Sequence, residues 1–132
     1  MNTLAKRYTL AALTALMLMS TAPTLQAQPA AKPAQFVYVL RLAPKFQTEA
    51  AWTDTEKAAV GRHFERLSKA TETGQVLLAG RTAEPLDKTF GLVIFEAENE
   101  AAAKAFMEAD PAVVAGLMTA TLHPYSVALM RK

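Results

Sequence analysis

The 132-residue sequence contains no cysteine, which excludes disulfide bonds, a thiol nucleophile and every thiolate metal site. It also has no glycine-rich phosphate loop and no serine nucleophile elbow. The chain also has no large excess of charge of either sign, because it contains 14 Lys and Arg residues and 12 Asp and Glu residues. What the chain does have is a hydrophobic content of 52% and the length of about one domain. A disordered chain is therefore excluded.

The first 27 residues have the order of a secretory signal peptide. Lys6 and Arg7 give a basic start, residues 8–19 are uncharged and apolar, and small residues follow up to Ala27. The apolar run is shorter than the ~20 residues that span a bilayer as a helix, which favours a cleaved signal over a membrane anchor. We therefore expect a periplasmic or secreted protein that begins near Gln28 and has no membrane attachment after cleavage.

Removal of residues 1–27 also changes the charge balance of the chain. It takes away two basic side chains and no acidic ones, which leaves 12 of each sign. A neutral domain without a basic run has no electrostatic footprint for nucleic acid, so no nucleic-acid partner is expected. Residues 28–34 are a tether rich in Pro and Ala, and the folded domain is expected over residues 35–132.

The hydrophobic pattern predicts four strands and two main helices. The strands are expected at 36–42, 75–79, 90–95 and 121–130, with Pro124 indicating an edge position for the last one. The first helix begins at a capping-box pattern over 53–56 and ends near Gly74, and its apolar stripe is expected to face the core. A second helix starts at Asn99, and Asp110-Pro111 marks a fresh helical start.

The element order βαββαβ is that of the α+β ferredoxin-like fold, an antiparallel sheet with both helices on one face. The other face is expected to be polar in a monomer. Instead, Val37 and Val39 oppose Phe36 and Tyr38 in the first strand, so both faces are apolar. This pattern predicts a homodimer in which the bare sheet faces of two subunits pack together.

His63 and Asp110 are the two candidates for catalysis. His63 borders the apolar stripe of the first helix, where it is either a partly buried imidazole with a structural partner or a general base beside a cavity. Asp110 precedes Pro111, which explains it as a helix N-cap. The two roles are compatible, because a capping carboxylate beside a cavity can also orient an imidazole.

Several further side chains are candidates for substrate binding. His123 shares one face of the last strand with Tyr125, so these residues line either a pocket or the dimer contact. Arg41 and Arg81 lie in or at the end of strands and are either solvated or able to receive a carboxylate or phenolate. The two His residues are 60 positions apart with no acidic residue at helical ligand spacing, so no metal site and no cofactor are predicted.

The C-terminal part of the chain resembles a known family. Residues 109–117 (Ala-Asp-Pro-Ala-Val-Val-Ala-Gly-Leu), followed by Leu122-His-Pro-Tyr125, are similar to the C-terminal signature of the YciI-like (YCII-related) proteins. Upstream, Trp52-Thr53, the His63 segment and the Leu-Leu-Ala-Gly run at 77–80 follow the order of the family. The resemblance covers nearly the whole mature domain. The chain departs from the family in its signal peptide and in Tyr125, where Trp is frequent.

The resemblance implies a dimeric α/β barrel with a His–Asp pair in a cleft between sheet and helices. By position this pair is His63 and Asp110, with His123 as a third pocket group. Related proteins include a dehydrochlorinase of a chlorinated hydroxyquinol, and muconolactone isomerases share the fold. Two hypotheses follow, namely a cofactor-free lyase or isomerase acting on a small cyclic or phenolic compound, or a non-catalytic dimer that binds a small molecule or is structural.

Overall fold

The computed structural model describes residues 32–131 of the chain. The predicted signal peptide over 1–27 and most of the predicted tether over 28–34 lie outside these residues, and both stay predictions. The first strand begins at Ala34, within one residue of the expected start of the domain.

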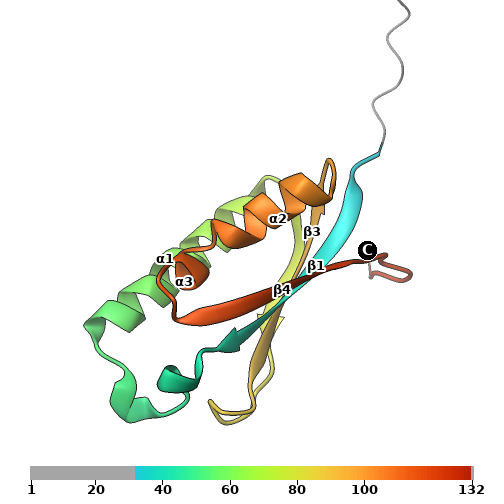
Figure 1. Ribbon diagram of the computed structural model, residues 1–132. Helices are drawn as coiled ribbons and strands as arrows, with labels where there is room; N and C mark the ends of the chain where they lie inside the picture. Colours follow the sequence, from blue (N-terminus) through green and yellow to red (C-terminus); the bar gives the residue numbers. More distant parts are fainter. Residues whose placement is uncertain (1–31, 132) are drawn as a thin grey trace, which may run out of the picture. The chain divides into compact units, whose positions relative to one another are not determined.

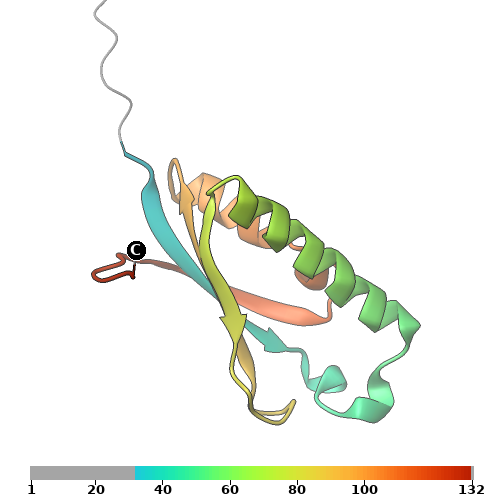
Figure 2. The same cartoon turned by 180° about the vertical axis from the view of Figure 1, so that it is seen from behind.

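The domain contains a four-stranded antiparallel sheet with its helices on one face (Figures 1 and 2). The order of the strands across the sheet is β2-β3-β1-β4, so β2 and β4 are the edges. This arrangement confirms the predicted α+β, ferredoxin-like fold. The elements in chain order are β1 (Ala34–Leu42), the 3₁₀ helices η1 (Pro44–Phe46) and η2 (Glu49–Ala51), α1 (Asp54–Glu72), β2 (Val76–Arg81), β3 (Phe90–Ala97), α2 (Glu100–Glu108), α3 (Pro111–Val114) and β4 (Met118–Pro124).

Local sequence signals fix both ends of α1. At the start, the Thr53 hydroxyl accepts a hydrogen bond from the Thr55 N–H at 3.2 Å, and the Glu56 carboxylate accepts one from the Thr53 N–H at 2.9 Å. This is the predicted capping box, which satisfies N–H groups that have no partner within the helix. At the end, Gly74 has φ +82°, a left-handed conformation that glycine adopts at no steric cost.

Strand register decides which side chains reach the core. Tyr38 lies opposite Val93 of β3 and Leu122 of β4, and all three point toward the helices. The aromatic ring of Phe95 stacks on Phe106 of α2 with 4.8 Å between the ring centroids. The buried residues of this main core are Phe36, Tyr38, Leu40, Leu67, Ala70, Val76, Val93, Phe95, Ala97, Ala103 and Met107.

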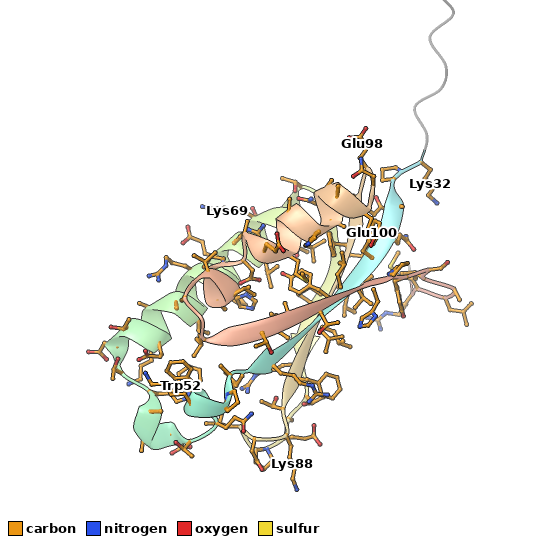
Figure 3. All side chains as sticks on the ribbon, in the orientation of Figure 1. Lys32, Trp52, Lys69, Lys88, Glu98 and Glu100 are labelled. Atoms are coloured by element: carbon orange, nitrogen blue, oxygen red, sulfur yellow. The ribbon has the colours of Figure 1, made fainter. Side chains whose placement is uncertain are left out.

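A second, smaller cluster holds the segment between β1 and α1. The indole N–H of Trp52 donates a hydrogen bond to the Phe46 carbonyl at 2.9 Å, which ties η1 to the start of α1 (Figure 3). Phe46 is buried there with Leu42 and Leu117, while Trp52 packs at the margin. The only tryptophan of the chain therefore reports on the packing of this cluster.

The last strand differs from the prediction. β4 runs over Met118–Pro124, whereas the sequence indicated 121–130. Pro124 has no N–H to donate, and its neighbour Phe36 lies only two residues from the start of β1, so little strand remains for a longer β4 to pair with. The edge position predicted from Pro124 is confirmed.

The face of the sheet that lies opposite the helices is largely apolar. Val37, Val39, Leu92 and Ile94 belong to it by strand register, and Leu78 of β2, with 54% of its surface exposed, lies beside Ile94. We call these five residues the open sheet face.

Over residues 32–131, no helix has the length and apolar character needed to cross a membrane.

Candidate active site

Asp110 occupies the junction between α2 and α3, and its carboxylate is fully buried. Its Oδ1 atom accepts a hydrogen bond from the Ala112 N–H at 2.9 Å, which makes Asp110 the N-cap of α3. Pro111 follows as the first helical residue, where a missing N–H costs nothing. The exposed fraction of Asp110 is 0%, so this cap holds a carboxylate at a fixed place inside the domain.

His63 of α1 is in direct contact with this carboxylate. Its Nδ1 atom lies 2.7 Å from Oδ1 and 2.8 Å from Oδ2 of Asp110. Because a carboxylate only accepts hydrogen bonds, the proton of this contact lies on Nδ1 of the imidazole. In the neutral ring, the lone pair is then on Nε2. A carboxylate that fixes the imidazole tautomer in this way prepares the opposite nitrogen to act as a base.

Tyr38 of β1 provides the third donor to Asp110. Its hydroxyl donates to Oδ2 at 2.8 Å, and the whole residue is inaccessible to solvent. Burial raises the pKa of Tyr38, and the charge of Asp110 and the hydrogen bond to it raise this pKa further, while nearby Arg66 lowers it to a smaller extent. The phenol therefore stays protonated and acts only as a donor to the carboxylate.

These donors keep Asp110 ionised despite its burial. Desolvation by burial raises the pKa of the carboxyl group, but the hydrogen bond and charge of His63, together with the donors of Tyr38 and Ala112, outweigh it. The net pKa of Asp110 lies below its ordinary value. At neutral pH the carboxylate is therefore an anion in direct contact with the His63 ring.

Arg66, one turn along α1 from His63, supports the same region. Its Nη2 atom donates to the Phe106 carbonyl at 2.7 Å, and its guanidinium lies 4.1 Å from the centroid of the Phe106 ring. Its Nη1 atom is buried and has no hydrogen-bond partner among residues 32–131. Arg66 therefore connects α1 to α2 beside the buried Tyr38 and Asp110.

A pocket of about 540 Å³ lies between α1 and the sheet, and His63 is part of its wall. This volume falls within the range of small-molecule sites. Ala79 and Gly91 line it from the sheet and have little or no side chain, which leaves space beneath α1. The lining residues are Leu40, Val60, His63, Phe64, Leu67, Ser68, Thr71, Ala79, Gly80, Arg81, Gly91, Leu92, Val93 and Met118. Leu92 is among them although strand register assigns it to the open sheet face.

The pocket changes the expected role of the α1 stripe. The spacing of Val60, Phe64, Leu67 and Thr71 indicated a core-facing stripe, and Leu67 is indeed buried. Phe64, however, is 72% exposed, because this part of the helix lies over the pocket instead of over large side chains of the sheet. The four residues share one side of α1 as the spacing predicts, and Phe64 lines the wall of an open cavity.

The structure sorts the predicted site residues into two groups. His63 and Asp110 are in direct contact, and Arg81 lines the same pocket as His63. Arg41 and His123 lie on the opposite face of the sheet, where Arg41 is 5.1 Å from the centroid of the Phe90 ring and His123 is exposed opposite Val37. Within one chain, neither of these two lies in the pocket.

Tyr125 and Tyr38 complete the comparison with the sequence analysis. Tyr125 follows the end of β4, where its N–H donates to the Gln35 carbonyl at 3.0 Å, and its side chain does not line the pocket. Tyr38 was predicted only as a residue of one strand face. The signal that points to it is a hydroxyl among apolar residues of an inward-facing strand, since a buried phenol usually needs a hydrogen-bond partner.

Between residues 32 and 131, no three His, Asp or Glu side chains gather as a metal ion requires.

Comparisons with known proteins place the domain in a family. No curated protein sequence matches the chain. Among solved structures, the chain is similar to the 5-chloro-2-hydroxyhydroquinone dehydrochlorinase TftG from Burkholderia phenoliruptrix AC1100 in complex with 2,5-dihydroxybenzoquinone, with 18% identity and a TM-score of 0.48 over 70% of this chain and 93% of that one. The family model of the YCII-related domain matches residues 35–122, which is most of the domain described above. The chain therefore belongs to the family of proteins with a YCII-related domain.

Proposed function

We propose that this protein is a small cofactor-free lyase or isomerase in which His63 moves a proton on a small cyclic or phenolic compound. The observation that supports the proposal is the contact of His63 Nδ1 with both oxygens of Asp110, at 2.7 and 2.8 Å, beside a pocket that His63 itself lines. A structural histidine would be expected in a filled space, and a capping Asp110 would need only the bond to Ala112. The open pocket and the further donors therefore favour catalysis over a purely structural dimer.

The steps of the reaction follow from the donors around Asp110. Nε2 of His63 accepts a proton from a C–H or O–H group of the bound compound, and the electron pair of that bond stays on the substrate. Asp110 stabilises the imidazolium that forms. In an isomerase the same ring returns the proton at another position. In a lyase the electron pair forms a double bond as a leaving group departs with its own electron pair.

A solvent-exchange assay tests this proposal. Small enolisable and phenolic compounds, including the 2,5-dihydroxybenzoquinone bound by the dehydrochlorinase, are incubated with the protein in D₂O, and proton loss and product formation are followed by NMR. His63→Gln is expected to lower exchange or turnover by about 10²–10⁴-fold, the usual contribution of a general base. Arg62→Gln, which changes an exposed residue of the same helix outside the pocket wall, is the control and should retain most of the activity. Equal rates for His63→Gln and wild type would contradict the proposal.

The proposal includes a homodimer formed through the open sheet face. The apolar character of the partly exposed Val39, Leu92 and Ile94 supports it, because a sheet face in contact with water in a monomer is expected to be polar, whereas Val37 is already buried within the chain. Ile94→Asp places a charge at the centre of this face and should convert a dimer into a monomer in sedimentation experiments. A wild-type protein that sediments as a monomer at micromolar concentration would refute this part of the proposal.

The proposal also places the protein outside the cytoplasm, in the periplasm or the medium. Support comes from the basic, apolar and small-residue order of residues 1–27, which lie outside the described part of the chain. The intact mass of the exported protein is expected to correspond to a chain that begins near Gln28. An exported protein that retains Met1 would rule out cleavage.

A further inference from the structure

We propose that the ligand of the pocket is a small anion, an apolar ring that carries a carboxylate or phenolate oxygen, and that Arg81 binds this oxygen. The inference rests on the proposed function in one respect, since it names the substrate class of the same pocket. It makes a separate statement about binding, which holds whether or not the compound is turned over. Four observations support it, namely the position of Arg81, its free donors, the space beside it and the charges around the pocket.

Arg81 is placed at the wall of the pocket by strand register. It is the last residue of β2 and lies opposite Gly91 of β3, in the row of the sheet that also contains the core residue Leu40. β2 is an edge strand, and Figure 2 shows α1 running beside it across one face of the sheet. Arg81 therefore lines the pocket from the sheet at an exposed position, whereas His63 lines it from the helix.

The donors of Arg81 are free to bind a ligand. Within residues 32–131, its guanidinium makes no hydrogen bond, ion pair or contact with an aromatic ring, whereas Arg41 lies over Phe90 and Arg66 over Phe106. A guanidinium is charged at every physiological pH and offers a fork of N–H donors that matches the two oxygens of a carboxylate. Unlike Arg41 and Arg66, Arg81 combines a pocket position with unused donors.

The sheet beside Arg81 offers space for a ring. Gly91 lies between Arg81 and Leu40 in the same row and has no side chain. A Cβ atom at Gly91 would be 3.5 Å from both the Gly80 carbonyl oxygen and the Leu40 Cβ, an ordinary contact distance, so the backbone does not require glycine for lack of room. A Cβ atom would therefore fit but would already be in contact with Leu40 and the Gly80 backbone, and the absence of a side chain at Gly91 leaves that space to the pocket.

The charges around the pocket favour an anion with an apolar body. No Asp or Glu contributes to the wall that residues 32–131 provide, and the nearby Asp110 is fully buried with three donors already bound. The ionisable wall residues are Arg81 and His63. The rest of the wall is mostly apolar, with Val60, Leu67 and Met118 among its members. The exposed Arg81 side chain is thus accessible to an anionic oxygen from the solvent side, while an apolar ring packs on the rest of the wall.

An anionic oxygen beside Arg81 also suits the proton transfer assigned to His63. When Nε2 removes a proton from a ring carbon, the electron pair of the C–H bond is delocalised onto a conjugated oxygen. A guanidinium beside that oxygen stabilises the charge that develops there. Arg81 is therefore expected to act in binding and in charge stabilisation, and His63 in the proton transfer itself.

Calorimetric titration of the full-length mature protein tests the inference with two matched pairs of probes. Benzoate is compared with neutral benzamide, and ionised 4-nitrophenol with neutral nitrobenzene. Wild type is expected to bind at least one anion more tightly than its neutral partner. Arg81→Gln should weaken the binding of that anion about tenfold or more, the usual effect of losing a charge-assisted hydrogen bond, and leave the neutral partner unchanged. The pair that responds distinguishes a carboxylate from a phenolate.

Two further variants keep the test decisive. Arg62→Gln removes the same charge from an exposed position of α1 that does not line the pocket, and it should leave anion binding unchanged. Gly91→Val fills the space beside Arg81 and should weaken both members of each probe pair. Equal binding by Arg81→Gln and wild type, equal loss in Arg62→Gln, or no preference of wild type for either anion would overturn the inference.

The outcomes also separate the inference from the proposed function. Anion binding that depends on Arg81, with no proton exchange in any compound, would support the assigned ligand class and contradict the proposed enzymatic function. Exchange that depends on His63, with anion binding unaffected by Arg81→Gln, would retain the enzyme and refute the assigned substrate class.

Discussion

The substitution Tyr38→Phe tests the buried hydrogen-bond network most directly. It removes the hydroxyl that donates to Asp110 Oδ2 at 2.8 Å and leaves the ring, whose centroid is 5.6 Å from that of Phe95. Asp110 keeps its bonds to His63 and to the Ala112 N–H. Because a hydrogen bond to a charged group contributes about 1.5–3 kcal/mol, we expect the free energy of unfolding at neutral pH to fall by about this amount.

The stability difference between wild type and Tyr38→Phe is expected to decrease both at low pH and at high pH. The pKa of Asp110 is lower in the folded than in the unfolded protein, so its stabilisation is present above the unfolded value of about 3.9 and is lost as the pH falls through the folded value. The pKa of Tyr38 is raised by burial and by Asp110, so the wild type loses about 1.4 kcal/mol per pH unit above pH ~10, where the unfolded tyrosine ionises. The Phe variant has no such loss. The difference between the two proteins is therefore largest near neutrality and decreases in acid and in strong base.

Urea unfolding followed by Trp52 fluorescence measures this difference, with all samples at one protein concentration because association alters apparent stability. Tyr125→Phe is the matched control, since Tyr125 is 44% exposed and its hydroxyl has no hydrogen-bond partner within residues 32–131. The control should change the unfolding free energy by less than about 0.5 kcal/mol. A Tyr38→Phe protein as stable as wild type at neutral pH, or a difference independent of pH, would refute the reasoning.

Three further predictions concern the same network and the ends of α1. Asp110→Asn removes the charge while retaining one acceptor, so we expect a loss of about 1–3 kcal/mol at neutral pH and a flatter stability profile between pH 3 and 5 than in wild type, measured by urea unfolding; a profile as steep as that of wild type would contradict the lowered pKa of Asp110. Gly74→Ala should cost about 1–2 kcal/mol because of φ +82°, whereas Gly61→Ala inside α1 should stabilise the protein by about 0.5–1 kcal/mol, and equal effects at both positions would be inconsistent with the left-handed conformation. Thr53→Ala should cost about 0.5–2 kcal/mol through loss of the capping box, and a melting temperature equal to that of wild type would argue against it.

The parts of the fold that depend on neighbouring residues could be predicted from the sequence. The capping box at Thr53, the left-handed Gly74 and the N-caps at Asn99 and Asp110 all use contacts within a few residues, and all are confirmed. Strand alternation also assigned the faces of β1 correctly. Alternation places Arg41 with Val39, away from the helices, so the same rule could have separated Arg41 from the pocket before the structure was known.

The candidate site could be predicted only in part, because its contacts join distant segments. His63 and Asp110 are 47 residues apart, and Tyr38 and Asp110 are 72 apart, so local patterns identify their types but not their meeting. The pocket depends on Gly91 and Ala79 lying beneath α1, which requires the register of β2 on β3, and this register includes an irregularity between Val76 and Leu78. The early end of β4 likewise depends on the length of its partner strand.

The His–Asp pair and the space of the pocket come from different parts of the fold, the pair from the helices and much of the space from the sheet. The His63 imidazole comes from α1 and contacts a carboxylate at the start of α3, whereas small residues of β2 and β3 line the pocket from the sheet. A single exchange at Gly91 or Ala79 thus changes the size of compound that is accepted without touching His63 or Asp110. Under the proposed function, the size of the ligand is therefore set from the sheet and the proton transfer from the helix side, so the two can be changed independently by substitution.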